Sequence, residues 1–222
     1  MGAAARGALP FVGLTGGLGA GKSTALGLLG ELGAATISAD AIVHELYRGE
    51  PLASLVTERW GEGVVDSTGA IDRQAIAKHV FADPDERTWL EGVIWPLVGQ
   101  RIHEFRQAAN RLAGAPAEGD APMPAAGATP DVPRVAVVET PLLFEAGMGA
   151  LYDVTIAVIA PEAVRTERAA ARGHAAVSER DARQLSQDEK AAQADHAVVN
   201  DGSVDQLRDR LAAVLDGIAP QA

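Results

Sequence analysis

Residues 16–23 have the composition and spacing of a loop that binds phosphate groups. They read GGLGAGKS and match the pattern G-x-x-x-x-G-K-S/T. Glycines let consecutive backbone N–H groups turn toward phosphate oxygens, and Lys22 would supply positive charge to the β- and γ-phosphates. Ser23 would offer its hydroxyl to Mg²⁺. The sequence therefore predicts a site for ATP and Mg²⁺. The loop residues expected to bind the nucleotide are Gly16, Gly17, Gly19, Ala20, Gly21, Lys22, Ser23 and Thr24.

The segments that flank this loop favour the same interpretation. Residues 10–15 are a short apolar run typical of a buried parallel strand, and residues 25–32 carry apolar side chains at helical spacing. A dinucleotide-binding fingerprint, G-x-G-x-x-G starting at Gly17, would need glycine at position 22, where Lys22 stands. A glycine-rich turn without function is the remaining alternative.

The rest of the chain alternates strand signals with helical ones. This alternation predicts an α/β fold, the three-layer sandwich of a P-loop NTPase, in which helices cover both faces of a parallel sheet. The predicted strands are 10–15, 34–37, 135–138, 153–159 and 197–199.

Two segments depart from this alternation. Residues 41–112 lack strand signals and predict an inserted helical lobe, with Pro96 expected to kink or interrupt its last helix. Together with the short chain, such a lobe suits a small-molecule kinase, whose second lobe holds the phosphate acceptor. Residues 113–133 are rich in alanine, glycine and proline and predict a mobile surface loop. The chain, residues 1–222, is then expected to be a single domain. Its core covers about 10–40 and 133–217, and an arginine-rich helical lid covers about 161–193.

Composition excludes several classes of function. The 222 residues include 19 basic and 30 acidic side chains, a net charge of -11, which argues against binding to nucleic acid or to an anionic membrane. The absence of cysteine removes disulfides, cysteine-ligated zinc and thiol nucleophiles. The five histidines show no metal-binding spacing. With no export signal or membrane span expected, the prediction is a cytoplasmic protein whose oligomeric state stays open.

Beyond the phosphate loop, several motifs resemble the dephospho-CoA kinase family of coenzyme A biosynthesis. They are SAD at 38–40, the segment from Gly61 to Arg73, PLLFE at 141–145, and the tail from Gln187 to Gly202. The resemblance runs from about Phe11 to Gly202 apart from the insertion at 113–133. It implies transfer of the ATP γ-phosphate to the ribose 3'-hydroxyl of dephospho-CoA, which gives coenzyme A.

The resemblance also assigns roles to single residues. Asp40 matches the family's catalytic aspartate, expected to orient or deprotonate the acceptor hydroxyl, and its place just beyond a strand suits that role. The alternative is that Asp40 only caps the helix that follows. Ser38 stands where the family usually has another acid. Trp95 replaces a histidine, and an indole cannot act as an acid or base.

Two glutamates near the third predicted strand are further candidates. Glu139 ends that strand, where P-loop enzymes commonly place an acid that holds Mg²⁺ through water; the alternative is an exposed strand-end carboxylate. Glu145 would contact the acceptor or cap a helix. The apolar residues between them, 142–144, are expected to form a wall rather than a catalytic element.

The arginine-rich segment and the tail complete the predicted site. Arg168 and Arg172 are expected to neutralise charge on the transferred phosphoryl group, whereas Arg165 is interpreted as part of a solvated, salt-bridged helix face. Asn200 and Gly202 match a family motif near the adenine of ATP, although a simple turn would explain the same letters.

Two other functions remain open from the sequence. A nucleoside or nucleotide kinase shares the phosphate loop, the helical lobe and the lid. An ATP-dependent regulatory switch would bind the nucleotide without transfer. A GTPase is disfavoured because the chain lacks an Asn-Lys-x-Asp motif, and residues 66–69 (DSTG) are interpreted as a turn.

Overall fold

A computed structural model describes residues 7–66, 68–119, 122–123, 129–171 and 184–218. The chain forms two compact units. One comprises Met1–Ser38 and Glu104–Ala222, here called the nucleotide unit, and the other comprises Ala39–His103, here called the helical unit. Within the described residues, no helix combines the length and the apolar character needed to cross a bilayer.

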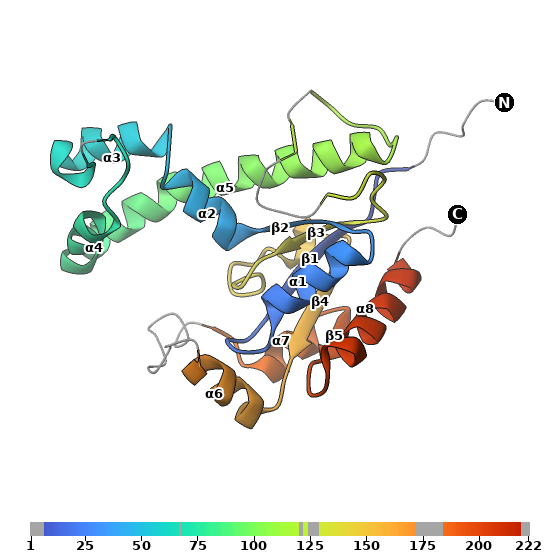
Figure 1. Cartoon of the computed structure of the whole chain (residues 1–222). Coiled ribbons are helices and arrows are strands. Elements are labelled where there is room, and N and C mark those ends of the chain that lie inside the picture. Colours follow the sequence, from blue (N-terminus) through green and yellow to red (C-terminus); the bar gives the residue numbers. More distant parts are fainter. Residues whose placement is uncertain (1–6, 67, 120–121, 124–128, 172–183, 219–222) are drawn as a thin grey trace. The chain divides into compact units, whose positions relative to one another are not determined.

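The nucleotide unit is built on a parallel sheet of five strands in the order β2-β3-β1-β4-β5 (Figure 1). All six residues of the central strand β1 are buried, as expected of a parallel strand covered on both faces. The fold class predicted from the sequence is confirmed. The strands are β1 (Phe11–Gly16), β2 (Ala35–Ser38), β3 (Ala136–Glu139), β4 (Val154–Ile159) and β5 (His196–Val199).

Helices pack on this sheet through apolar side chains. α1 (Lys22–Glu31) and α8 (Val204–Ile218) share a core cluster with β1, in which Leu29, Leu211 and Leu215 are fully buried. α7 (Gln187–Gln193) contacts β4 and β1, and α6 (Glu162–Ala171) follows β4. The carboxyl ends of β1 and β4 therefore lead directly into the loop before α1 and into α6.

The helical unit contains α2 (Ala39–Leu46), α3 (Leu52–Trp60), the short turn η1 (Glu62–Val64), α4 (Arg73–Ala82) and most of α5 (Pro84–Leu112). A carboxyl oxygen of Asp83 accepts a hydrogen bond from the Asp85 N–H at 2.8 Å, which fixes the start of α5. Helix α5 continues through Pro96, so the interruption expected there does not occur.

Two loops can be compared with their predicted roles. The Asp66 carboxylate accepts hydrogen bonds from the Thr68 and Ala70 N–H groups, so this segment is a turn, as predicted. The described residues of 113–133 contain no helix or strand. Ala113 and Pro133, at the ends of that segment, are buried. A second short turn, η2 (Gly149–Leu151), lies before β4.

Candidate active site

The loop between β1 and α1 takes a conformation that requires glycine. Gly19 and Gly21 have φ angles of 74° and 95°, in the left-handed region that other residues rarely adopt. A Cβ atom on Gly19 would lie 2.6 Å from the Arg165 carbonyl oxygen, and one on Gly21 would lie 2.2 Å from Asn200 Nδ2. The glycines thus serve both the turn itself and the close approach of two other segments.

The first turn of α1 is arranged to receive an anion. Gly21 occupies the N-cap position and has no side chain with which to cap the helix, so the first N–H groups of α1 remain for a ligand. The Lys22 Nζ atom donates to the Gly17 carbonyl oxygen at 3.1 Å, within the loop itself. Ser23 and Thr24 are exposed on the same turn. A phosphate group bound here would meet backbone N–H groups, a hydroxyl and an ammonium group.

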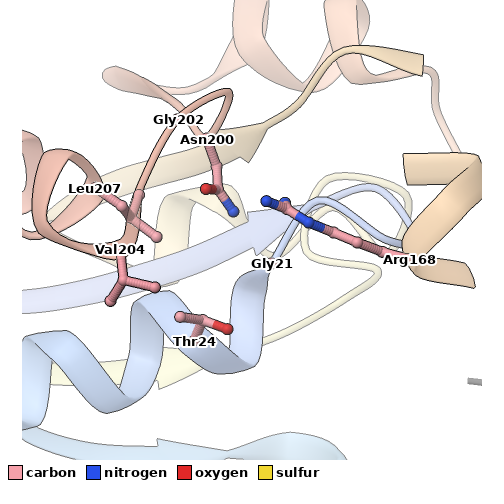
Figure 2. A pocket seen from close by; sticks show the side chains of 7 residues that line it. All are labelled: Gly21, Thr24, Arg168, Asn200, Gly202, Val204 and Leu207. Carbon is pink, nitrogen blue, oxygen red and sulfur yellow. The ribbon is translucent and has the colours of Figure 1, made fainter. Parts of the chain in front are cut away.

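A pocket of about 230 Å³ opens beside this turn (Figure 2). Asn200, which follows β5, is buried in its wall, and its Nδ2 atom donates to the Ala20 carbonyl oxygen at 2.8 Å. The Asn200 amide nitrogen therefore holds the phosphate loop in place. The pocket is lined by Gly21, Thr24, Arg168, Asn200, Gly202, Val204 and Leu207.

Arg168 reaches this pocket from α6. Figure 2 shows its guanidinium directed toward Gly21 and Asn200. Its Nη1 atom is buried and has no hydrogen-bond partner within the described part of the chain. Buried donors are normally paired, and an unpaired one carries its full desolvation cost. A phosphate oxygen would supply the missing acceptor. Arg172 lies outside the described residues.

The structure contradicts the interpretation of Arg165 as part of a solvated helix face. It is only partly exposed, and its Nε atom donates to the Leu18 carbonyl oxygen at 2.9 Å. This contact ties α6 to the phosphate loop. The two residues are 147 positions apart in sequence, so the charge pattern of one helix could not reveal it.

Glu139 ends β3 beside β1 and β2, and its side chain is buried. The alternative of an exposed strand-end carboxylate is therefore wrong. Ser38, at the end of β2, donates its hydroxyl to the Glu139 Oε2 atom at 2.6 Å. Ser38, which stands where the family usually has another acid, thus orients the Glu139 carboxylate. A hydroxyl from Ser23 and a carboxylate from Glu139 are the hard oxygen donors that suit Mg²⁺.

Lys190 and Glu145 form a buried pair that the sequence interpretation missed. The Lys190 side chain is 0% exposed and its Nζ atom lies 2.9 Å from Glu145 Oε1 and 2.6 Å from the Pro141 carbonyl oxygen. Glu145 Oε1 also accepts from the Leu185 N–H at 2.8 Å. Glu145 therefore does not cap a helix, and its Oε2 atom is buried without a hydrogen-bond partner among the described residues. Lysine is rare in this chain, and both residues lie in motifs of the family resemblance, PLLFE at 141–145 and the tail from Gln187 to Gly202.

Asp40 lies in the helical unit, in the first turn of α2. Its carboxylate is exposed and makes no hydrogen bond or ion pair with the described residues. The structure thus gives no sign of the capping contact that was the alternative role.

Trp95, on α5, is 46% exposed. Among the described side chains, no group of three or more His, Cys, Asp or Glu residues is arranged to hold a metal.

Comparisons with known proteins agree with this geometry. The family model described as Dephospho-CoA kinase matches residues 10–114 and 125–206. A dephospho-CoA kinase from Anaeromyxobacter dehalogenans is 38% identical over 213 residues, which cover 93% of this chain and 92% of the relative. One from Symbiobacterium thermophilum is 37% identical over 207 residues, which cover 91% and 78%.

Solved structures show the same fold. A crystal structure of a protein from Thermus thermophilus has a TM-score of 0.71 at 30% identity and covers 97% of this chain and 100% of that one. The dephospho-CoA kinase from Campylobacter jejuni has a TM-score of 0.60 at 21% identity, with coverage of 95% and 97%. The family model and the two relatives each span far more than half of the chain. The chain therefore belongs to the dephospho-CoA kinase family, a family of ATP-dependent phosphotransferases.

Proposed function

We propose that this protein transfers the γ-phosphate of ATP to the ribose 3'-hydroxyl of dephospho-CoA, the last step of coenzyme A synthesis. The structural observation that carries the proposal is the buried, unpaired Nη1 atom of Arg168 beside the uncapped start of α1. An anion would satisfy both features, and the phosphates of ATP are the anions that a loop of this sequence binds.

In the proposed reaction, the 3'-oxygen of the acceptor forms a bond to the γ-phosphorus while the bond from that phosphorus to the β,γ-bridging oxygen breaks. ADP leaves with the electron pair of the broken bond. Asp40 orients the hydroxyl and accepts its proton, which then passes to solvent. The loop N–H groups, Lys22 and Arg168 neutralise charge on the phosphates, and Arg172 is proposed to contribute in the same way.

We also propose places for Mg²⁺ and for the adenine base of ATP. When bound, Mg²⁺ would neutralise charge on the β- and γ-phosphate oxygens. Ser23 would hold it directly, and Glu139 through water, with the Ser38 hydroxyl fixing the Glu139 carboxylate. The adenine is proposed to lie against Gly202 and Val204 in the pocket beside α1. We also propose a cytoplasmic location, in keeping with a chain that has no cysteine.

A panel of acceptors tests this function. The purified protein is incubated with Mg-ATP and, separately, with dephospho-CoA, nucleosides and nucleoside monophosphates, while ADP formation and product mass are followed. Addition of one phosphate to dephospho-CoA alone supports the proposal. Turnover on a nucleoside or nucleotide but not on dephospho-CoA identifies a nucleoside or nucleotide kinase, and ATP binding without turnover identifies a switch. The control, Lys22→Ala, should abolish transfer to every acceptor.

A further inference from the structure

We propose that Arg73, with Arg48 beside it, binds the diphosphate of dephospho-CoA in the helical unit. This inference rests on the proposed function, because it assigns a subsite for the acceptor of that reaction. The subsite is formed by four residues that come from α2, the turn after it and α4: His44, Tyr47, Arg48 and Arg73.

The guanidinium of Arg73 is held in a fixed orientation by two neighbours. Its Nη2 atom lies 2.8 Å from the Nδ1 atom of His44, and because a guanidinium only donates, the imidazole nitrogen accepts. Its central carbon lies 4.8 Å from the centre of the Tyr47 ring. Stacking on one face and a bond at one edge leave the other N–H groups of a planar donor available for two phosphate oxygens.

The imidazole of His44, which contacts this guanidinium, lies near two positive charges and one negative charge. The pKa of His44 is held below its ordinary value, chiefly by the positive charge of Arg48 and next by that of Arg73, with Glu45 acting weakly in the opposite direction. Neither arginine forms an ion pair with a carboxylate of the described residues. In a chain with a net charge of -11, two guanidinium groups near one imidazole favour an anion as the ligand of this cluster.

The position of the cluster on α2 suits the geometry of the acceptor. Asp40, His44 and Tyr47 are spaced at i, i+4 and i+7, and the Tyr47 N–H continues the helical pattern by donating to the Val43 carbonyl oxygen. At a rise of about 1.5 Å per residue, the cluster begins ~6 Å along the axis from Asp40. The 3'-hydroxyl and the 5'-diphosphate of dephospho-CoA belong to the same ribose. A sugar with its hydroxyl at Asp40 can therefore place its diphosphate at Arg73.

The test compares Arg73→Ala with Lys78→Ala, which removes a positive charge from an exposed position on the same helix. The steady-state rates are measured with dephospho-CoA and with adenosine, which has the 3'-hydroxyl but no phosphate. Binding of dephospho-CoA without ATP is measured by calorimetry, and circular dichroism confirms folding. Arg73→Ala should lower kcat/KM for dephospho-CoA, and its affinity, by roughly tenfold to a hundredfold. The rate with adenosine should change less than about twofold, and Arg73→Lys should lie between the two proteins.

Each outcome decides the matter. If Arg73→Ala lowers the rates on both acceptors equally, or if it behaves like Lys78→Ala, the diphosphate subsite is wrong. If the wild-type protein phosphorylates neither acceptor, the proposed function has failed, but the calorimetric comparison still decides the subsite. Weaker binding of dephospho-CoA to Arg73→Ala than to the wild-type protein then supports the diphosphate subsite. Equal binding to the two proteins, or no binding to the wild-type protein, overturns it.

Discussion

Arg168 is expected to destabilise the folded protein but to assist phosphoryl transfer. Its buried Nη1 atom has no hydrogen-bond partner among the described residues, so its removal should relieve a desolvation penalty, whereas in the proposed reaction the same atom would pair with a phosphate oxygen of ATP. We expect Arg168→Met to lower kcat by about 10³ or more and to leave the melting temperature unchanged or raised. Steady-state kinetics and thermal unfolding measure the two effects.

The matched control for this substitution is Arg134→Met. Arg134 pairs with Asp216 at 2.8 Å on the surface of the same unit, where an ion pair contributes little. Its loss should leave both kcat and the melting temperature close to the wild-type values. A fall in melting temperature for Arg168→Met, with turnover retained, would show that the guanidinium is structural.

Asp40 can be separated from nucleotide binding, because no described residue ties it to the rest of the protein. Asp40→Asn keeps the shape of the side chain but removes its ability to accept a proton. We expect kcat to fall by about 10² to 10⁴, with the Kd for ATP changed less than about twofold. Rapid-quench kinetics and nucleotide titrations provide these values. Asp85→Asn, another exposed carboxylate of the helical unit, is the control, and near-normal turnover in Asp40→Asn would remove Asp40 from the mechanism.

At the scale of single residues, the sequence predicted the phosphate loop but not its supporting contacts. The loop is a continuous motif, so its residue types and spacing can be read from one short segment. Arg165, Lys190 and Glu139, by contrast, meet partners that are 147, 49 and 101 residues away in sequence. Local charge patterns hold no information about such pairs, so Arg165 looked like part of a solvated surface.

At the scale of elements, α7 is fixed to the loop after β3 by the buried Lys190–Glu145 pair. The Pro141 carbonyl oxygen that accepts from Lys190 also accepts from the Thr15 hydroxyl at 3.2 Å, one residue before the glycine loop. Gln187 adds a second tie, because its amide exchanges two hydrogen bonds with the backbone of Ala160, between β4 and α6. These contacts connect the segments on either side of the arginine-rich helix to the base of the phosphate loop.

The pair should behave as a buried ion pair in unfolding experiments. Lys190→Met leaves the Glu145 carboxylate, of which only 12% is exposed, without its counter-charge, and should lower the free energy of unfolding by about 3 kcal/mol. The double variant Lys190→Met/Glu145→Leu should recover much of that loss, because no isolated charge remains. Urea unfolding measures both. A double variant less stable than Lys190→Met would show that the carboxylate has a separate structural role.

The elements themselves were predictable because their signals are local. All five strands appear as short apolar runs, and the Asp83–Pro84 pair marks the start of α5. The order of the strands in the sheet, β2-β3-β1-β4-β5, cannot be predicted from the local sequence of any of these segments. Of the two effects expected at Pro96, a kink or an interruption, the interruption does not occur, since a long helix can lose one hydrogen bond and continue when the turns on both sides are intact.

At the scale of the whole molecule, the acidic composition and the phosphate site are compatible because charge acts locally. A net charge of -11 describes the surface as a whole. At the proposed site, Lys22, Arg168 and the first N–H groups of α1 present positive charge to the ligand. The cluster around Arg73 repeats this arrangement in the helical unit. The global charge therefore argues against a surface that binds nucleic acid or an anionic membrane, but not against small polyanionic ligands.

The insertion between α5 and β3 offers a test of how much of the chain the proposed function needs. The family model matches on both sides of residues 115–124 and omits them. The ends of the insertion belong to the core, since Ala113 and Pro133 are buried and the Ala115 N–H donates to the Asn110 carbonyl oxygen. We therefore expect replacement of residues 116–131 by a short Gly-Ser linker to keep kcat/KM within about threefold. Loop closure entropy changes by only about 0.6 kcal/mol for each halving of loop length, so stability should change little.

A second variant, in which a Gly-Ser segment of the same length replaces residues 116–131, separates length from sequence. Both variants are assayed with ATP and dephospho-CoA, and their unfolding is followed by circular dichroism. If the shortened protein is folded but inactive while the equal-length variant is active, the reach of the segment matters for function. If both are folded and inactive, side chains of the insertion contribute to the site, and the active region extends beyond the phosphate loop, α6 and the helical unit.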